Sequence, residues 1–329
     1  MLFDIPIEPL EERYSAQWAG WFKAAFDAHC QQKWFRIYGS KVSPVIKNGA
    51  FLDVVHTNLY KASQLQRLCS AVEDGDLADD DIVFFHDLWF PGIEMLAYIR
   101  DGLGLKFKIY GCLHAGVYDP NDFLSKQGMR PWATHFEKSM LQIVDGVFVA
   151  TNYHKDLICK DHPAAREKIH VTGFPIASRP YTNVQKDPRL VVFPHRLNDE
   201  KRPDLFAELA KLLGPTWHCV RTKDVCQTKS QYYELLERAS VAVSFAEQET
   251  WGIAMQEALF CGCIPVVPNR LSYVEMYLPC LRFDTLDEAV QLVINNERNK
   301  VAAEVAFERL QESGYQAIER IMCKMGVWK

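Results

Sequence analysis

Two glutamates eight residues apart, Glu249 and Glu257, stand in the stretch of this sequence that is best suited to chemistry. Glu249 follows the apolar segment 241–245, which predicts a buried strand, and Glu257 lies eight residues after Glu249, on a helix predicted over 252–260. The turn between them offers backbone N–H groups at a helix start, which favour an anion such as a sugar diphosphate. Taken by itself, the spacing favours a simpler interpretation, a helix-dipole partner and a solvated helix residue.

The wider pattern resembles the Glu-x7-Glu signature of retaining glycosyltransferases with the GT-B fold, in particular the large family four. Gly252 lies between the two glutamates, and the run EALFCGCIPVVPN begins at the second. The resemblance implies that Glu249 lies beside the donor sugar and that Glu257 holds the ribose hydroxyls. It also implies that the amides of Trp251, Gly252 and Ile253 meet the sugar and the phosphates.

A basic loop follows the strand predicted over 190–193. It carries Arg196 and Lys201 at the carboxyl end of that strand, where two cations can clamp a diphosphate and stabilise a leaving nucleotide. Two cations on a loop are more usually solvated. The stretch resembles the phosphate clamp of the family, with His195 where glycine is usual. By this resemblance both cations are predicted to act in catalysis and in donor binding.

The next strand predicted in the second half, 218–220, ends beside Thr222 and Lys223, where the family commonly places the nucleotide base. The pair His195-Arg196 and the run CGCIPVVPNRLSYVEMYLP are similar to the second domain of the enzymes that mannosylate queuosine in tRNA. The chain also resembles the small family-four enzymes by which bacteriophages glycosylate hydroxymethylated bases in their DNA.

Histidines end two adjacent strands predicted in the first half of the chain, His86 after 81–85 and His114 after 106–110. An isolated histidine is usually structural, but the resemblance implies that His114 contacts the donor sugar and takes part in catalysis. The residues that could line the acceptor side are polar or aromatic and belong to the first half: Arg13, His86, Asp87, Asp119, Asp122, Trp132, His135 and Glu137.

The first predicted loop, PIEPLEERY, lacks the glycine-rich turn that binds phosphate in Rossmann-like folds. It holds Glu8, Glu11 and Glu12 instead, so a pyrophosphate is not expected there, and the loop departs from the family pattern. Arg13 either reaches an acceptor phosphate or pairs with a neighbouring glutamate, and we favour the pair.

The alternation of apolar strands and amphipathic helices predicts an α/β protein. The resemblance implies the GT-B fold, with two Rossmann-like domains facing a cleft. We expect an acceptor-side domain over 1–176, a nucleotide-sugar-binding domain over 177–312, and a C-terminal helix, 313–329, that returns to the first domain. The linker is expected over 178–187. The expected strands are 2–7, 35–38, 51–55, 81–85, 106–110, 144–150, 168–171, 190–193, 218–220, 241–245, 264–267 and 281–283. The expected helices are 15–28, 58–72, 92–100, 204–213, 230–239, 252–260, 286–295, 298–311 and 315–328. A break at Ser313-Gly314 is expected to separate the last two.

The composition is that of a globular chain: 329 residues, 48% hydrophobic and 24% charged, with a net charge of -5. No apolar run reaches about 18 residues, and the start has no basic segment followed by an apolar one, so a cytoplasmic protein without membrane partners is expected. The ten cysteines contain no C-x2-C pair and predict reduced thiols in the core. The acidic run 73–81 lacks the ligand order of a calcium loop and predicts a solvated turn, so no metal is expected.

The resemblance implies a retaining glycosyltransferase that uses a UDP or GDP sugar as donor and no other cofactor. The leading prediction for the acceptor is a hydroxymethylated pyrimidine in DNA, with a tRNA base next, and a glycan or lipid acceptor as the enzyme alternative. A GT-B nucleotide-sugar epimerase and an inactive binding module remain open, as does the oligomeric state. The acidic net charge weighs against nucleic acid. Candidate phosphate contacts are scattered over the first domain: Lys33, Arg36, Lys41, Lys47, Lys106 and Lys108.

Overall fold

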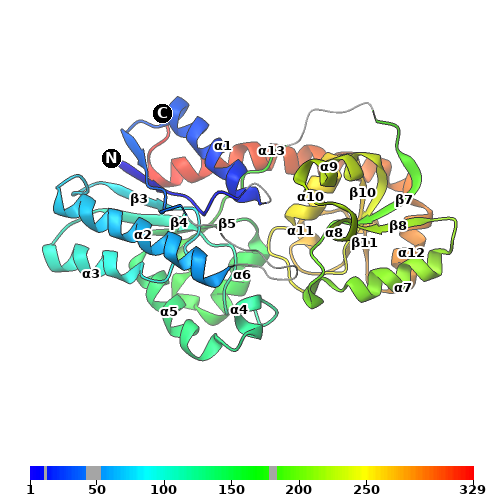
Figure 1. Ribbon diagram of the computed structural model, residues 1–329, viewed down its shortest axis with the longest axis horizontal. Coiled ribbons are helices and arrows are strands. Elements are labelled where there is room, and N and C mark those ends of the chain that lie inside the picture. Colours follow the sequence, from blue (N-terminus) through cyan, green and yellow to red (C-terminus); the bar gives the residue numbers. More distant parts are fainter. Residues whose placement is uncertain (11–12, 42–52, 178–183) are drawn as a thin grey trace. The chain divides into compact units, whose positions relative to one another are not determined.

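The computed structural model describes residues 1–10, 13–41, 53–177 and 184–329, and it divides into two compact units (Figure 1). Unit 1 comprises Met1–Ala150, His154–Pro175 and Gln316–Lys329, and unit 2 comprises Thr151–Tyr153 and Ile176–Tyr315. The main division thus falls between residues 175 and 176, beside the boundary expected from the sequence. Glu11, Glu12, Lys47 and linker positions 178–183 lie outside the described residues.

Unit 1 is built on a six-stranded parallel sheet of order β2-β1-β3-β4-β5-β6. Its strands are β1 Leu2–Ile5, β2 Trp34–Arg36, β3 Ile82–Phe85, β4 Lys108–Cys112, β5 Gly146–Val149 and β6 Ile169–Val171. Its helices are α1 Tyr14–His29, α2 Val54–Glu73, α3 Glu94–Leu103, α4 Phe123–Lys126 and α5 Arg130–Ile143, followed by α6 Asn152–Asp161, whose first two residues belong to unit 2.

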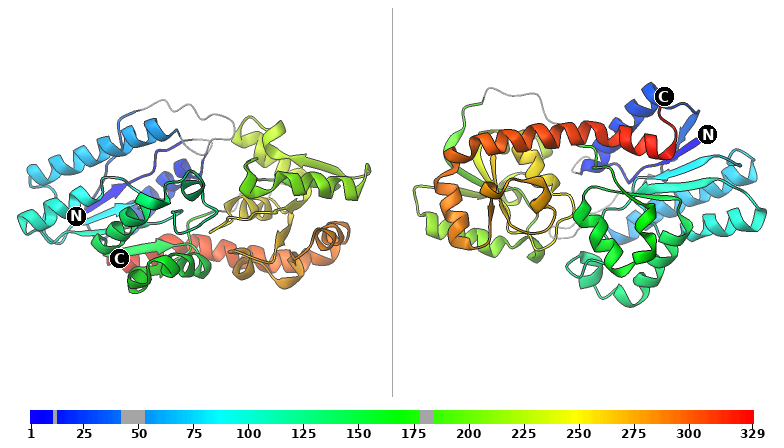
Figure 2. Two further views of the ribbon diagram at one scale, coloured as in Figure 1. Left: turned by 90° about the horizontal axis from the view of Figure 1, so that it is seen from below. Right: turned by 180° about the vertical axis from the view of Figure 1, so that it is seen from behind.

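Both faces of this sheet are covered, which explains why its strands are apolar throughout rather than alternating. On β3, Val83 and Phe85 join the core cluster that includes Leu68 of α2. Phe84 points to the other face, where its ring lies 5.2 Å from that of Phe22 on α1. Figure 2 shows helices on both sides of the sheet.

Unit 2 contains a five-stranded parallel sheet of order β11-β10-β9-β7-β8. Its strands are β7 Asp187–Phe193, β8 His218–Arg221, β9 Ala239–Val243, β10 Ile264–Pro268 and β11 Arg282–Phe283. Its helices are α7 Pro203–Leu213, α8 Thr222–Val225, α9 Lys229–Arg238, α10 Ile253–Phe260, α11 Tyr273–Met276 and α12 Leu286–Ile294, followed by α13 Lys300–Met325, whose end belongs to unit 1. One face of the sheet packs on α7 and α12.

The strand order reverses once in each unit, and open α/β sheets bind ligands at the carboxyl ends of the strands on either side of such a reversal. In unit 1 the reversal lies between β1 and β3, and in unit 2 between β7 and β9. The loops that follow these four strands are therefore the places where each unit can build a site.

The strand expected over 51–55 is wrong in its described part. Asp53 is the N-cap of α2, and its carboxylate accepts a hydrogen bond of 3.1 Å from the backbone N–H of His56. An aspartate cap outweighs the strand preference of the valines at 54 and 55, so α2 begins four residues before the expected helix. Positions 51 and 52 lie outside the described residues.

The break expected at Ser313-Gly314 is also wrong, because α13 runs through both residues. A glycine inside a helix costs only about 1 kcal/mol relative to alanine, too little to end a well-packed helix. The residue is there for close packing: a Cβ on Gly314 would lie 2.5 Å from the carbonyl oxygen of Ile176. The last turns of α13 belong to unit 1, where Arg320 Nε donates to the Thr172 carbonyl at 2.8 Å.

None of the helices within the described ranges has the length and apolar character needed to cross a membrane. Cys30, Cys112, Cys159 and Cys263 are buried as the sequence predicted, but Cys280 and Cys323 are exposed rather than in the core. No group of three potential metal-ligating side chains was found in the described part of the chain.

Candidate active site

An ion pair between Lys201 and Glu249 lies at the strand reversal of unit 2. Lys201 ends the short turn Asp199–Lys201 after β7, and Glu249 lies in the loop between β9 and α10. The ammonium is 3.3 Å from the carboxylate and also donates to the backbone carbonyl of Gln248. The Lys201 side chain is only 7% exposed and that of Glu249 15%, so each buried charge needs the opposite charge to offset its loss of hydration.

Although burial by itself would raise it, the pKa of Glu249 is lowered to about 2, because the Lys201 ammonium and hydrogen bonds stabilise the carboxylate. One of these bonds comes from the backbone N–H of Gly252, and the N–H of Trp251 lies 3.4 Å from the same carboxylate. Glu249 is therefore an anion throughout the physiological range. Two of the three amides predicted to meet a donor sugar, those of Trp251 and Gly252, thus hold this carboxylate in the structure.

Gly252 caps the N-terminus of α10 in a left-handed conformation, with φ of 67°. A Cβ here would also lie 3.0 Å from the Tyr273 ring, so backbone and packing both favour glycine. The turn directs the N-terminus of α10, starting at Ile253, toward the end of the sheet at which Glu249 lies.

Arg196 is paired within its own loop. Its guanidinium lies 2.8 Å from Glu200 Oε1, and its side chain is 29% exposed. The two predicted clamp cations therefore both follow β7, and each has a carboxylate partner. A bound diphosphate would have to compete with Glu200 for Arg196 and with Glu249 for Lys201.

His195, found where the family usually has glycine, joins β7 to the β9 loop. Its Nε2 lies 2.8 Å from Ser244 Oγ, which lies 2.9 Å from Tyr273 Oη. Burial, with Lys201 nearby, lowers the pKa of His195 to about 3, so the ring is neutral. The sequence interpretation did not assign Ser244 or Tyr273 to the site, because 49 residues separate His195 from Ser244.

Glu257 is held by three side chains of α9. Lys229 Nζ lies 2.6 Å and Tyr233 Oη 2.7 Å from its Oε1, and Tyr232 Oη lies 3.1 Å from its Oε2. The solvated-residue interpretation of Glu257 is wrong, since it is 8% exposed. The three partners were missed, although their spacing of three and four residues places them on one helical face.

Thr222 and Lys223 begin α8, after β8. Thr222 is buried and its hydroxyl donates to the Phe193 carbonyl at 3.3 Å, whereas Lys223 is exposed. Of the two residues predicted to lie near a nucleotide base, Lys223 is thus the one whose side chain is accessible.

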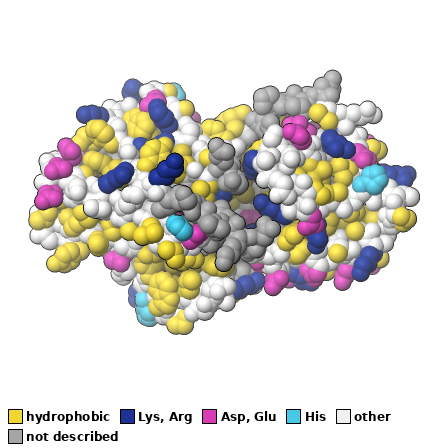
Figure 3. Space-filling model, viewed as in Figure 1, with side chains coloured by type: hydrophobic (Ala, Val, Ile, Leu, Met, Phe, Trp, Pro, Cys, Tyr) yellow, Lys and Arg dark blue, Asp and Glu magenta, His cyan; other side chains and the backbone are white. Residues whose placement is uncertain are grey.

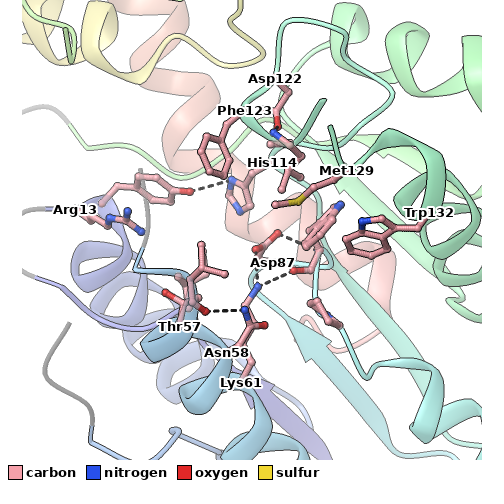
Figure 4. A pocket seen from close by; sticks show the side chains of 17 residues that line it. Arg13, Thr57, Asn58, Lys61, Asp87, His114, Asp122, Phe123, Met129 and Trp132 are labelled. Atoms are coloured by element: carbon pink, nitrogen blue, oxygen red, sulfur yellow. Dashed lines mark hydrogen bonds and ion pairs between the residues drawn. The ribbon is translucent and has the colours of Figure 1, made fainter. Parts of the chain in front are cut away.

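Unit 1 contains a cavity of about 350 Å³ at its own strand reversal (Figure 4). It lies at the carboxyl ends of β1, β3 and β4, and α2, α4 and α5 also contribute walls. Five of the residues predicted from the sequence line it: Arg13, Asp87, His114, Asp122 and Trp132. Side chains that sequence reasoning missed include Tyr14, Asn58, Lys61, Trp89 and Phe123.

His114 uses both ring nitrogens. Nε2 lies 2.8 Å from the backbone carbonyl oxygen of His86, and Nδ1 lies 3.2 Å from Tyr14 Oη. Because a carbonyl only accepts, Nε2 carries the proton and Nδ1 accepts from the tyrosine. Burial lowers the pKa of His114, which favours this neutral form.

His86 is not an acceptor-side residue. It is fully buried, its Nε2 lies 2.7 Å from Asp4 Oδ1, and the other oxygen of Asp4 pairs with Arg36. Arg36, expected to be free for phosphate contacts, is thus engaged in the same buried network, with 7% of its side chain exposed.

Two further predictions for the acceptor side, Asp119 and Glu137, are corrected, and a third residue, His135, does not line this cavity. Asp119 is buried and accepts a hydrogen bond from the Asn121 N–H at 2.9 Å, which makes a local turn. Glu137 is fully buried, and its carboxylate accepts hydrogen bonds from the Trp89 indole and the Val117 backbone N–H. His135 is exposed on α5, outside the cavity lining that the structure describes.

The predicted phosphate contacts Lys33, Lys106 and Lys108 lie at or before the amino ends of β2 and β4. The cavity lies at the carboxyl ends of the strands. Because the amino and carboxyl ends of parallel strands lie at opposite ends of the sheet, these lysines are not neighbours of the cavity.

Comparison with solved structures shows the GT-B fold predicted from the sequence. The sucrose-phosphate synthase of Thermosynechococcus elongatus superposes with a TM-score of 0.63 over 99% of this chain and 97% of that one, at 11% identity. A UDP-forming α,α-trehalose-phosphate synthase from Burkholderia xenovorans gives 0.62 over 99% and 98%, at 14% identity. The pneumococcal O-GlcNAc transferase GtfA, solved with UDP and GlcNAc, gives 0.53 over 81% and 60%, at 14% identity.

No protein-family model matches the sequence. Among curated proteins, the tRNA-queuosine α-mannosyltransferase of Drosophila melanogaster is 43% identical over 49 residues, which are 15% of this chain and 13% of that protein. The matched part is thus a short segment of either protein.

Proposed function

We propose that this protein is a retaining glycosyltransferase that transfers a sugar from a UDP or GDP sugar to an acceptor hydroxyl. The observation that carries the proposal is the arrangement at the strand reversal of unit 2. There the buried Lys201–Glu249 pair adjoins the N-terminus of α10, and Glu257 lies about one turn further along that helix. This order of groups matches the Glu-x7-Glu pattern of the family that the sequence resembles.

In the proposed reaction Arg196 and Lys201 bind the diphosphate, and Glu257 accepts hydrogen bonds from the ribose hydroxyls. The bond between the anomeric carbon and the phosphate oxygen breaks while the acceptor oxygen attacks from the same face. The hydroxyl proton passes to the leaving phosphate oxygen. Glu249 and the α10 amides stabilise the positive charge and the polar groups of the sugar as the bond breaks. No resident metal is required in this scheme, since the two cations neutralise the phosphates.

For the acceptor we propose a hydroxymethylated pyrimidine base in DNA. Two resemblances support this: the segment shared with a tRNA-queuosine mannosyltransferase, whose name describes transfer to a nucleobase, and the sequence pattern of the phage enzymes. On the face shown in Figure 3, Lys and Arg side chains are scattered rather than gathered into one patch. With a net charge of -5, we expect weak backbone contacts and recognition mainly through the base.

The direct test is incubation of the protein with a pool of UDP and GDP sugars and DNA containing 5-hydroxymethylcytosine or 5-hydroxymethyluracil. Mass spectrometry of the nucleosides should show a gain of one sugar. The anomeric proton coupling of the product should match that of the donor, because transfer with retention preserves the configuration. An inverted product would refute the mechanism, and hydrolysis of donor without a modified nucleoside would move the acceptor to tRNA.

A second reaction containing donor alone tests the main alternative. An epimerase would convert the nucleotide sugar into its epimer without any acceptor. A transferase should leave the donor unchanged or hydrolyse it slowly.

A further inference from the structure

The cavity of unit 1 has the chemistry of a site for a flat heteroaromatic ring. We propose that it binds the acceptor as a pyrimidine base, stacked on the indole of Trp132, with its polar edge on Asp87 and Lys61. This inference rests on the proposed function, and it names the place and the side chains that recognise the substrate.

The walls of the cavity are rich in aromatic rings. Tyr14, Trp89, Phe123 and Trp132 reach it from α1, the loop after β3, α4 and α5. Its volume of about 350 Å³ falls in the lower part of the range of about 300–1,000 Å³ for small-molecule sites. Such a space suits one nucleoside-sized group better than a long chain.

Trp132 is the ring most able to accept a stacked base. It is 53% exposed, and Figure 4 shows it at the side of the cavity, near Met129. Its ring centroid lies 6.1 Å from that of Trp89 with the planes at 64°, so the two indoles meet edge to face and do not stack on each other. The faces of Trp132 therefore remain free of Trp89.

The Trp89 wall is fixed before any ligand arrives. Its indole N–H donates to Glu137 Oε1 at 3.0 Å, and the same oxygen accepts from the Val117 N–H at 2.6 Å. Glu137 is fully buried, and a Cβ on Gly116 would lie 2.5 Å from its Oε1, so the chain is closely fitted around this carboxylate. A preset wall lowers the entropic cost of binding a rigid ring.

The polar edge of the proposed site is an ion pair. Lys61 Nζ lies 3.2 Å from Asp87 Oδ2 and 2.6 Å from the Trp89 carbonyl, and Asp87 Oδ1 accepts from the Trp89 N–H at 3.1 Å. A hydrogen-bond acceptor and a donor thus lie side by side in the cavity. The pairing edge of cytosine or uracil presents a donor next to an acceptor, which this pair complements.

A sugar acceptor would make different demands. Glycan rings carry hydroxyl groups around their whole circumference and need polar partners on several sides, whereas most of this cavity wall is apolar. A lipid chain has no polar edge to match the Asp87–Lys61 pair. Aromatic walls with a few polar groups at one place are instead typical of pockets that take an extruded base.

The experiment is saturation-transfer NMR on the full chain with 5-hydroxymethyl-2′-deoxycytidine, in the presence of excess UDP and GDP to fill a nucleotide site in unit 2. We expect strong transfer to the base proton H6. Trp132→Ala should weaken nucleoside binding about tenfold or more, as loss of a stacking partner does. Tyr98→Ala on α3, which removes an aromatic ring that is 82% exposed outside the cavity, is the matched control and should have no effect.

Two further measurements separate this inference from the proposed function. Glu257→Ala should abolish donor hydrolysis and leave nucleoside binding intact. Trp132→Ala should weaken nucleoside binding and leave donor hydrolysis intact. Absence of base saturation, equal binding by wild type and Trp132→Ala, or preferential saturation of maltose would overturn the base pocket. If the nucleoside binds at the Trp132 site but no UDP or GDP sugar is cleaved, the pocket stands and the glycosyltransferase proposal fails.

Discussion

The ammonium of Lys201 lies 3.3 Å from the carboxylate of Glu249, although 48 residues separate them in the sequence. Both side chains are withdrawn from water, so neither charge would be stable there without the other. The pair therefore links the loop after β7 to the loop after β9, at the strand reversal of unit 2.

Breaking this pair from the cationic side should destabilise unit 2. In Lys201→Met, Glu249 would be left buried without its cation, at a cost of about 3–5 kcal/mol in the free energy of unfolding, and its pKa should rise. Chemical denaturation of unit 2, followed by amide exchange in β7 and β9, measures the cost. The double variant Lys201→Met/Glu249→Gln should recover part of the loss; a single variant as stable as wild type would contradict the coupling.

The low pKa of Glu249 predicts a pH dependence of stability. The folded-state pKa is about 2 against an ordinary value of 4.5, so the unfolded chain binds the proton more readily. This contribution is fully present above about pH 5.5 and is lost as the pH falls toward 2. Urea unfolding at intervals between pH 7 and pH 3 should show a shallower acid loss in Glu249→Gln than in wild type; parallel curves would count against a paired carboxylate.

Glu257 should decide nucleotide affinity. In Glu257→Gln the neutral amide accepts hydrogen bonds more weakly than the carboxylate, so the dissociation constant for UDP or GDP should rise about tenfold or more. Isothermal titration measures it. Glu234→Gln on the exposed side of α9 is the matched control and should bind nucleotide as wild type does. Equal affinities in all three proteins would remove Glu257 from the site.

Glu137 should stabilise unit 1 through the hydrogen bonds that its carboxylate accepts from Trp89 and Val117. Glu137→Ala removes the acceptor of the partly buried Trp89 indole N–H and of the buried Val117 N–H, at a cost of about 3 kcal/mol. Lys138→Ala, one residue along on the exposed face of α5, should change stability by less than about 0.5 kcal/mol. Urea unfolding monitored by tryptophan fluorescence compares the two; similar stabilities would refute the buried role.

Gly314 and Gly20 should respond in opposite directions to the same substitution. Gly314→Ala places a Cβ 2.5 Å from the Ile176 carbonyl oxygen and should destabilise by about 1–3 kcal/mol despite the better helix propensity of alanine. Gly20→Ala, in the interior of α1 with open space around it, should stabilise by up to about 1 kcal/mol. Thermal unfolding provides the comparison, and stabilisation by both changes would show that α13 does not need the close approach.

Much of the fold could be predicted because its signals are local. The apolar runs and helical periodicity located β9, α10 and β10 to within a few residues, and Gly252 between Glu249 and Glu257 marked the turn. Where two local signals competed, the sequence misled: the Asp53 cap overrode a strand pattern, and Gly314 was taken for a helix break. In both cases the deciding interaction was one that the periodicity does not report.

The sequence by itself determined the residue types at the strand ends and the Glu-x7-Glu spacing, since these depend on neighbours along the chain. Only the tertiary structure decided which of these residues meet. It places His195 within hydrogen-bond distance of Ser244, and Lys229 and two tyrosines within hydrogen-bond distance of Glu257. It also buries His86 against Asp4, which is 82 residues away in the sequence. The physical reason is that partners at the ends of a sheet are fixed by strand order, which follows from packing of the whole unit and not from any local pattern.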